Sequence, residues 1–287
     1  MTDQKYFKPS EDGKSYIFLG GEGISGEVRI PAEHNGLPVT KIGDAAFFNC
    51  GELRRVEIPD TVTEIGSRAF MACFALDHID LPSGLHTLGS QAFLNCLKIK
   101  SIKLPKALRG LPDSAFKHCF GLESISLPEG LVTIGRNAFN GCNALMGVEL
   151  PSTVEVVGRY AFNSCENLRR VRLNEGLQRI EKGAFSYCTS LSEIDIPTGV
   201  SEIGSSAFSN CKALSRIGIP SSVKTIGDHA FSGCNSLVRL TLPEGLEELG
   251  DYAFSMCENL EEVSLPHSLI KQGKFIFGKC PKIKNTK

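Results

Sequence analysis

The chain has 287 residues, of which 41% are hydrophobic and 22% charged, and its formal net charge is −1. A nearly neutral chain lacks the global field that attracts nucleic acid, so no nucleic-acid partner is expected. Membrane insertion is not expected either, because no stretch reaches the roughly 18 apolar residues of a membrane span. Residues 1–7 also lack the apolar run of a signal peptide. The chain is therefore expected either to stay in the cytoplasm or to have lost a leader.

The first part of the chain is irregular. Residues 28–31 (Val-Arg-Ile-Pro) match residues 56–59 (Val-Glu-Ile-Pro), but at a spacing of 28. The extra residues fall in a turn over 32–38 that contains Pro and Gly, and residues 39–43 then rejoin the register of the following chain. Residues 1–42 are predicted to form an N-terminal cap with a first irregular repeat, because a terminal repeat has one face without a neighbour.

From residue 43 to residue 273 the sequence repeats every 23 residues without an insertion. Self-similarity at such a period predicts a solenoid, in which each unit buries its apolar face only against its neighbours. Residues 43–273 are therefore predicted to form the solenoid, and residues 274–287 a degenerate C-terminal repeat. Every cysteine follows the period: Cys50, Cys73, Cys96, Cys119, Cys142, Cys165, Cys188, Cys211, Cys234, Cys257 and Cys280.

Each repeat has three parts, as residues 53–73 illustrate. Residues 53–58 end in strict alternation of apolar and charged side chains, which predicts a short strand that the following proline ends. Residues 62–66 (Val-Thr-Glu-Ile-Gly) predict a second short extended piece before a glycine turn. Residues 67–73 are interpreted as one helical or 3₁₀ turn. The predicted fold class is therefore an α/β repeat solenoid with short parallel strands.

The shared phase of the cysteines places them in one row that points the same way. Such a row disfavours disulfides, whose Cβ atoms must face each other about 3.8 Å apart. A metal site is disfavoured too, because ligands must converge on a point while these side chains recede along a line. The row is interpreted as buried thiols that act as small apolar residues. No cofactor or metal site is expected.

The repeat pattern Ala-Phe-x-x-Cys-x-x-Leu-x-x-Ile-x-Leu-Pro-x-x-Leu-x-x-Ile-Gly resembles the BspA-like, or treponemal-type, leucine-rich repeat family. The resemblance covers roughly residues 28–285. It implies a curved right-handed solenoid that takes part in adhesion and protein binding and not in catalysis. It also implies a cell-surface or secreted location and a protein partner such as a host or matrix protein. The lack of a signal peptide departs from the typical surface member and leaves the cytoplasm as the other location.

A search for catalytic motifs returns one pattern, Gly-x-Gly-x-x-Gly from Gly21 to Gly26, after a predicted strand at residues 16–19. A dinucleotide site needs a helix to begin at this point, so that the helix N-terminus can hold the pyrophosphate. Residues 27–31 read as a strand instead, so the pattern is interpreted as a turn. No catalytic residue is predicted, and the chain is interpreted as not being an enzyme.

The outward strand positions vary far more than the inward ones. They are interpreted either as an ordinary solvated face or as a recognition surface for a protein. Arg170 and Arg172 are expected beside Glu193 and Asp195, as adjacent patches of opposite sign that would select and steer a partner. The predicted protein-binding residues are Arg55, Glu57, His78, Asp80, Arg170, Arg172, Glu193 and Asp195.

Two functions remain open at this point. The first is a non-enzymatic, adhesin-type or interaction module that binds a protein through the exposed strand face. The second is a structural spacer or assembly module that associates through its ends, which would depend on Phe277 and Ile283. The expected state is a monomer or a weak end-to-end oligomer.

Overall fold

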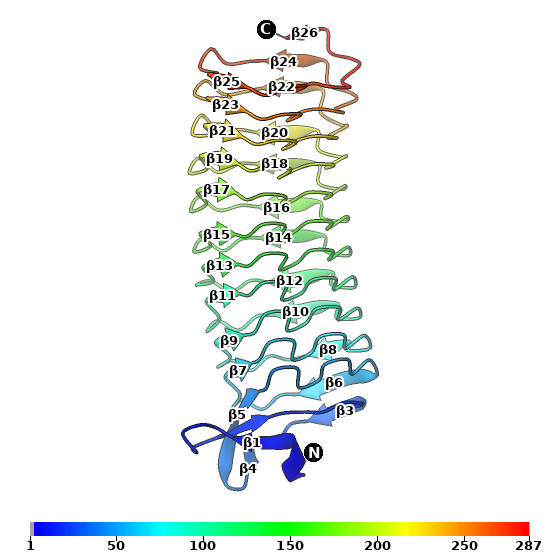
Figure 1. The fold of residues 1–287 in the computed structure, drawn as a ribbon, viewed down its shortest axis with the longest axis vertical. Helices are drawn as coiled ribbons and strands as arrows, with labels where there is room; N and C mark the ends of the chain where they lie inside the picture. The colour runs from blue at the N-terminus through cyan, green and yellow to red at the C-terminus, as the bar shows by residue number, and fades with distance from the viewer. Residues whose placement is uncertain (1–2, 287) are drawn as a thin grey trace. The chain divides into compact units, whose positions relative to one another are not determined.

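The computed structural model describes residues 3–286 and divides into two compact units, Met1–Ala144 and Leu145–Lys287. Each unit is a stack of repeats, here called rungs, that pair strand to strand (Figure 1). Most rungs have a primary strand that precedes a Leu-Pro or Ile-Pro pair, and a secondary strand that precedes a glycine. A turn segment then leads to the next primary strand.

The N-terminal unit begins with the 3₁₀ helix η1 (Gln4–Tyr6), the strands β1 (Phe7–Pro9) and β2 (Tyr16–Phe18), and later the short β4 (Glu33–His34). Its primary strands are β3 (Gly26–Arg29), β6 (Leu53–Glu57), β8 (His78–Ile79), β10 (Ser101–Lys103) and β12 (Ser124–Ser126). Its secondary strands are β5 (Leu37–Ile42), β7 (Glu64–Ile65), β9 (Thr87–Leu88), β11 (Gly110–Leu111) and β13 (Thr133–Ile134).

The C-terminal unit repeats this plan. Its primary strands are β14 (Gly147–Glu149), β16 (Arg170–Arg172), β18 (Glu193–Asp195), β20 (Arg216–Gly218), β22 (Arg239–Thr241), β24 (Glu262–Ser264) and β26 (Asn285–Thr286). Its secondary strands are β15 (Val156–Val157), β17 (Arg179–Ile180), β19 (Glu202–Ile203), β21 (Thr225–Ile226), β23 (Glu248–Leu249) and β25 (Lys271–Gln272). Paired strands of the unit run parallel and 23 residues apart, as Ile203 and Ile226 illustrate. The predicted period and parallel strands are confirmed.

A small sheet covers the first rung of the N-terminal unit. Strand β1 runs antiparallel to β2, which in turn runs parallel to β5. The Phe7 ring lies edge-on to Phe18, with 5.5 Å between centroids, and is stacked on His34 at 4.1 Å. The predicted spacing of 28 residues is confirmed, because β3 and β6 pair with Val28 opposite Val56. The cap therefore shields the apolar face that a first rung would otherwise leave open.

The core of each unit is built from columns of identical side chains. The phenylalanine rings stack nearly parallel along the column, at centroid separations of 5.0–5.6 Å from Phe47 to Phe139. The predicted row of buried thiols is also present, with Cys280 only partly buried. A thiol donates to the phenylalanine carbonyl of the preceding rung, as Cys73 Sγ does to Phe47 O at 3.1 Å. This bond satisfies the polar part of a side chain that otherwise packs as an apolar group.

The turn segments differ from the predicted helical or 3₁₀ turn. They are hydrogen-bonded β-turns, in which two residues four apart have left-handed backbones, for example Arg68 (φ 57°) and Ala72 (φ 61°). A left-handed residue interrupts a right-handed helix. Amide groups between them bond across the stack, as Phe70 N does to Ala92 O at 2.8 Å. Hydrogen bonds to the neighbouring rung therefore replace the internal hydrogen bonds of a helix.

Asn174 stands where neighbouring rungs have the strand-ending proline. Its Nδ2 donates to Pro151 O at 2.7 Å and to Val154 O at 2.9 Å, and its Oδ1 accepts from Gly176 N at 2.7 Å. The side-chain amide thus ties two rungs together by hydrogen bonds at a position that usually holds an apolar ring.

Candidate protein-binding face

The outward residues of the primary strands form an exposed face in each unit, because side chains alternate between the two sides of a strand. In the N-terminal unit the predicted residues Arg55 and His78 lie opposite each other on β6 and β8. His78 Nε2 lies 2.9 Å from Asp80 Oδ2. Glu57 pairs with Arg29, with 3.5 Å between Oε2 and Nε. All four predicted residues of this unit are exposed on neighbouring rungs.

The other four predicted residues lie in the C-terminal unit, on the neighbouring strands β16 and β18. Their ion pairs are formed with the strands on either side of this pair of strands. Arg172 Nη1 lies 2.9 Å from Glu149 Oε1 on β14, and Asp195 Oδ1 lies 3.4 Å from Arg216 Nη2 on β20. Because β16 and β18 are neighbours, the positive patch on β16 and the negative patch on β18 are adjacent, as the sequence suggested.

Sequence reasoning did not assign Glu149 and Arg216 to the site, although both occupy the same outward columns as the predicted residues. The sequence signal for Glu149 was an opposite charge 23 residues before Arg172. The signal for Arg216 was an opposite charge on the strand after Asp195. Exposed ion pairs of this kind contribute only about 0–1 kcal/mol each to stability. A charged partner can therefore replace them at little cost, which suits a binding surface more than a structural one.

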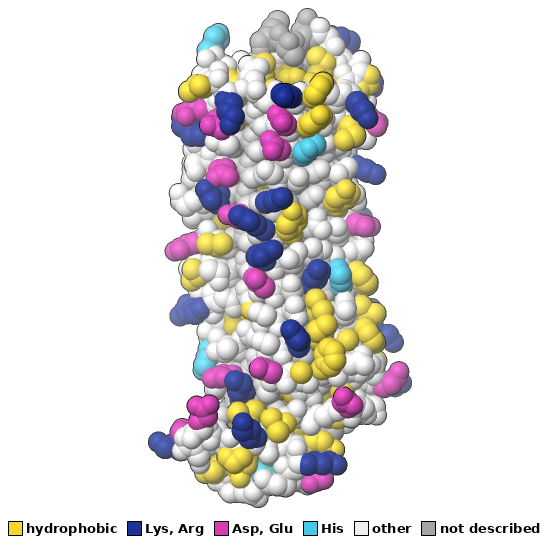
Figure 2. All heavy atoms as spheres, viewed as in Figure 1, with side chains coloured by type: hydrophobic (Ala, Val, Ile, Leu, Met, Phe, Trp, Pro, Cys, Tyr) yellow, Lys and Arg dark blue, Asp and Glu magenta, His cyan; other side chains and the backbone are white. Residues whose placement is uncertain are grey.

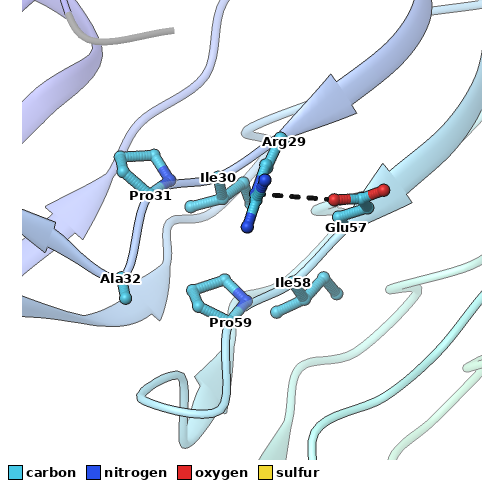
Figure 3. Close-up of a pocket in the computed structure, with 7 residues that line it drawn as sticks. All are labelled: Arg29, Ile30, Pro31, Ala32, Glu57, Ile58 and Pro59. Atoms are coloured by element: carbon cyan, nitrogen blue, oxygen red, sulfur yellow. Dashed lines mark ion pairs between the residues drawn. The ribbon is translucent and has the colours of Figure 1, made fainter.

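A cavity of about 540 Å³ lies where the repeat spacing is irregular in the N-terminal unit (Figure 3). The Arg29–Glu57 ion pair borders it. The remaining lining residues are apolar, namely Ile30, Pro31, Ala32, Ile58 and Pro59. These side chains can hold an apolar group beside a charged one, and none of them is a nucleophile.

The buried thiols of the core are poor nucleophiles. Burial raises the pKa of Cys73, Cys119 and Cys211 to about 12, so these groups stay protonated at neutral pH. Within residues 3–286 no three His, Cys, Asp or Glu side chains gather closely enough to hold a metal ion. None of the helices in that range has the length and apolarity needed to cross a bilayer.

Stacked 23-residue rungs with parallel strands and columns of identical core residues define a repeat solenoid of the leucine-rich type. The family model for the BspA type leucine rich repeat region matches residues 28–145, 110–238 and 201–287. The chain therefore belongs to this family, as its repeat pattern suggested. No curated protein matches the chain.

Several solved structures are similar over nearly the whole chain. A leucine rich cell surface protein from Faecalibacterium prausnitzii is 28% identical, with a TM-score of 0.61, over 100% of this chain and 94% of that one. A leucine-rich repeat protein from Bacteroides ovatus is 26% identical, with a TM-score of 0.57, over 98% and 92%. The T. pallidum leucine rich repeat protein is 28% identical, with a TM-score of 0.54, over 74% and 90%.

Proposed function

We propose that this chain is a non-enzymatic protein-interaction module that binds its partner through the outward face of the primary strands. The observation that carries the proposal is the charged row on β14, β16, β18 and β20, in which Arg172 pairs with the preceding rung and Asp195 with the following one. The side chains of this row are exposed, and their charge alternates in sign from strand to strand. The inward side chains of the same strands are uniformly apolar. Such a row favours one partner over others through the arrangement of its charges.

An adhesin-type role at the cell surface agrees with the similarity to the Faecalibacterium prausnitzii relative, which is a leucine rich cell surface protein. The partner would then be a protein of the surroundings, such as a host or matrix protein. The Arg55–Asp80 set on β6 and β8 offers a second charged area of the same kind in the N-terminal unit.

The proposal is tested with the double variant Arg170→Glu/Arg172→Glu against a panel of purified extracellular-matrix proteins. Surface plasmon resonance is recorded at low and at physiological salt. We expect wild type to bind at least one of these proteins, with an affinity that falls as salt screens the charges. The double variant should bind that protein about tenfold more weakly or worse, and with a smaller salt dependence.

Arg136→Glu is the control, because it reverses the charge of an exposed turn residue off the strand face, which is half the charge change of the double variant. It should bind as wild type does. Equal binding by wild type and the Arg170/Arg172 variant would contradict the proposal, and so would an equal loss in the control.

The alternative is an assembly module that associates through its end, and one observation favours it. The last described repeat exposes Ile270 (81%) and Phe275 (66%), and Phe277 and Ile283 are partly exposed. Phe275 also continues a stacked surface column through Tyr252 to His229, at 5.4 and 4.9 Å between centroids. Light scattering over a concentration series distinguishes the two functions. Growth of the particle that Phe277→Ser/Ile283→Ser abolishes would support assembly, and a monomer throughout would exclude it.

A further inference from the structure

The turn segments of the two units have the same backbone but differ in side-chain type at two positions. These positions are the residue after the core Ala-Phe pair and the residue after the core cysteine. In the C-terminal unit these two columns are almost entirely polar: Asn163, Ser186, Ser209, Ser232, Ser255 and Gly278 in the first, and Glu166, Thr189, Lys212, Asn235, Glu258 and Pro281 in the second.

The serines close the first column against solvent. They are only 2–9% exposed. Their hydroxyls bond along the stack, with Ser186 Oγ donating to Ser209 O at 3.3 Å and the hydroxyl oxygens of Ser232 and Ser255 lying 2.9 Å apart. These serines satisfy one another's polar groups and add no apolar side chain to the surface.

In the N-terminal unit the same columns carry large apolar side chains, here called the apolar strip. Phe48, Phe74 and Phe120 are 44%, 42% and 48% exposed, and the side chains between them are partly exposed. Figure 2 shows hydrophobic side chains gathered at the lower right of the view. The strip consists of Phe48, Met71 and Leu94 in the first column and Phe74, Leu97 and Phe120 in the second.

Positive charge borders the apolar strip. Lys117 is the next residue of the first column after Leu94, and Lys98 directly follows Leu97. Among the residues that the structure describes, neither lysine has an ion-pair partner, whereas Lys100 close by is paired with Glu123. Glu52 is the acidic residue that shares the column of Lys98. Glu52 and Asp77 are exposed beside the first two rungs of the strip, and the two lysines make the border positive beside its last two rungs.

The geometry points to a docking surface for an acidic amphipathic helix of a partner protein, lying along the stack. Rungs are about 4.8 Å apart, and the turns of an α-helix are about 5.4 Å apart. Over the four rungs from Phe48 to Phe120, about three turns of helix can place one apolar residue against each rung. Same-face residues of an extended strand are about 6.6 Å apart, so a strand would lose register by about 2 Å per rung.

Charge and exposure favour this occupant over a lipid surface or a second copy. An apolar strip with a basic border complements a helix that has one apolar face and carboxylates beside it. Segments that enter a bilayer insert their apolar side chains about 5–10 Å deep, whereas these rings are more than half buried between rungs. A second copy of the strip would place Lys98 and Lys117 against like charges.

The probe is a fluorescein-labelled synthetic peptide of about 18 residues. Its leucines follow the helical spacing i, i+4, i+7 and i+11, and glutamate and alanine fill the other positions. Fluorescence anisotropy measures its binding to the full chain. The test variant Leu94→Ser/Leu97→Thr introduces the residue types that the C-terminal unit has at Ser186 and Thr189, so the same backbone accommodates them. We expect it to bind at least about tenfold more weakly than wild type.

A charge swap tests the basic border separately. Lys98→Glu/Lys117→Glu should weaken binding of the glutamate peptide severalfold and strengthen binding of a peptide with lysine in place of glutamate. Val238→Ser, which changes an exposed apolar residue elsewhere, and Arg172→Glu on the strand face are controls that should bind as wild type does. Because the strand-face proposal is tested with other variants and other ligands, the two can fail independently.

Three results would overturn the inference. The first is a wild-type protein that fails to bind the glutamate peptide, or binds a scrambled peptide of the same composition equally well. The second is sedimentation with vesicles of phosphatidylcholine and phosphatidylglycerol that the Leu94/Leu97 variant abolishes, which would make the strip a lipid-binding surface. The third is a dimer in light scattering that the same variant dissociates. Melting curves by circular dichroism show whether each variant is folded.

Discussion

An interior rung and the last described rung of the C-terminal unit share the phenylalanine and the cysteine of the repeat but have very different surroundings. The Phe208 ring lies between Phe185 at 5.5 Å and Phe231 at 5.2 Å, and it is fully buried. Phe277 lies 6.0 Å from Phe254, at an angle of 22°, and is partly exposed. Burial of this phenylalanine therefore depends on having a neighbouring rung on each side.

The sharpest test of this comparison is the same substitution in both rungs. Phe208→Ala should lower the free energy of unfolding by about 3–5 kcal/mol, as expected for a core cavity. Phe277→Ala should lower it by only about 1 kcal/mol, because part of that side chain is already in water. Urea unfolding followed by circular dichroism measures both, since the chain has no tryptophan. Equal losses would show that the two environments are energetically alike.

The N-terminal cap offers the opposite case of an end that is covered. Phe7 is 5% exposed and packs on Phe18 and His34. We expect Phe7→Ala to cost about 2–3 kcal/mol, below an interior phenylalanine because one side of the cap faces solvent. The same urea experiment measures it. A loss under about 1 kcal/mol would mean that the cap does not protect the first rung.

Asn174 tests whether an irregular interior rung depends on hydrogen bonds. Asn174→Ala removes two donors and one acceptor, and should cost about 1–3 kcal/mol. Asn174→Pro restores the residue type of the neighbouring rungs and should be less destabilising. Thermal unfolding by circular dichroism compares the two variants. A proline variant that is less stable than the alanine variant would show that this rung has adapted to the amide.

Cysteine reactivity compares the last described rung with the rung before it without any substitution. The neighbouring Cys257 thiol lowers the pKa of the partly buried Cys280 to about 7, whereas Cys280 and burial raise the pKa of Cys257. Because the thiolate forms as the pH rises through the pKa, iodoacetamide should label Cys280 first, with a rate that increases around pH 7. Mass spectrometry of peptides identifies the labelled site. Equal labelling of Cys257 in the folded protein would contradict the difference in burial.

The inward columns and the strand register could be predicted from the sequence, because a fixed period leaves only one way to align the repeats. The match of Val28 with Val56 was predictable despite its unusual spacing. The turn segments were not, because most of their left-handed positions hold residues such as Arg68 and Tyr160 that favour other conformations. Strand β1 was also missed, since its pairing with β2 depends on the cap as a whole.

The candidate faces were only partly predictable. Alternation places Arg172 and Asp195 outward, but each has several opposite charges within reach, and only coordinates select Glu149 and Arg216 as their partners. The apolar strip was missed because Met71 and Leu94 lie in turn segments that were interpreted as helical. A helix would have placed residues three apart on neighbouring rows, without the outward columns that the β-turns create.

The left-handed residues also bear on how the protein is made. An L-residue in this conformation costs about 1–2 kcal/mol, and a rung such as the one with Arg68 and Ala72 has two of them. The amides of Arg68 and Ala72 donate to the carbonyl oxygens of Ser90 and Leu94 on the following rung, and a free repeat in water lacks these acceptors. We therefore expect the turn of each newly synthesised repeat to stay unfolded until the next repeat has left the ribosome.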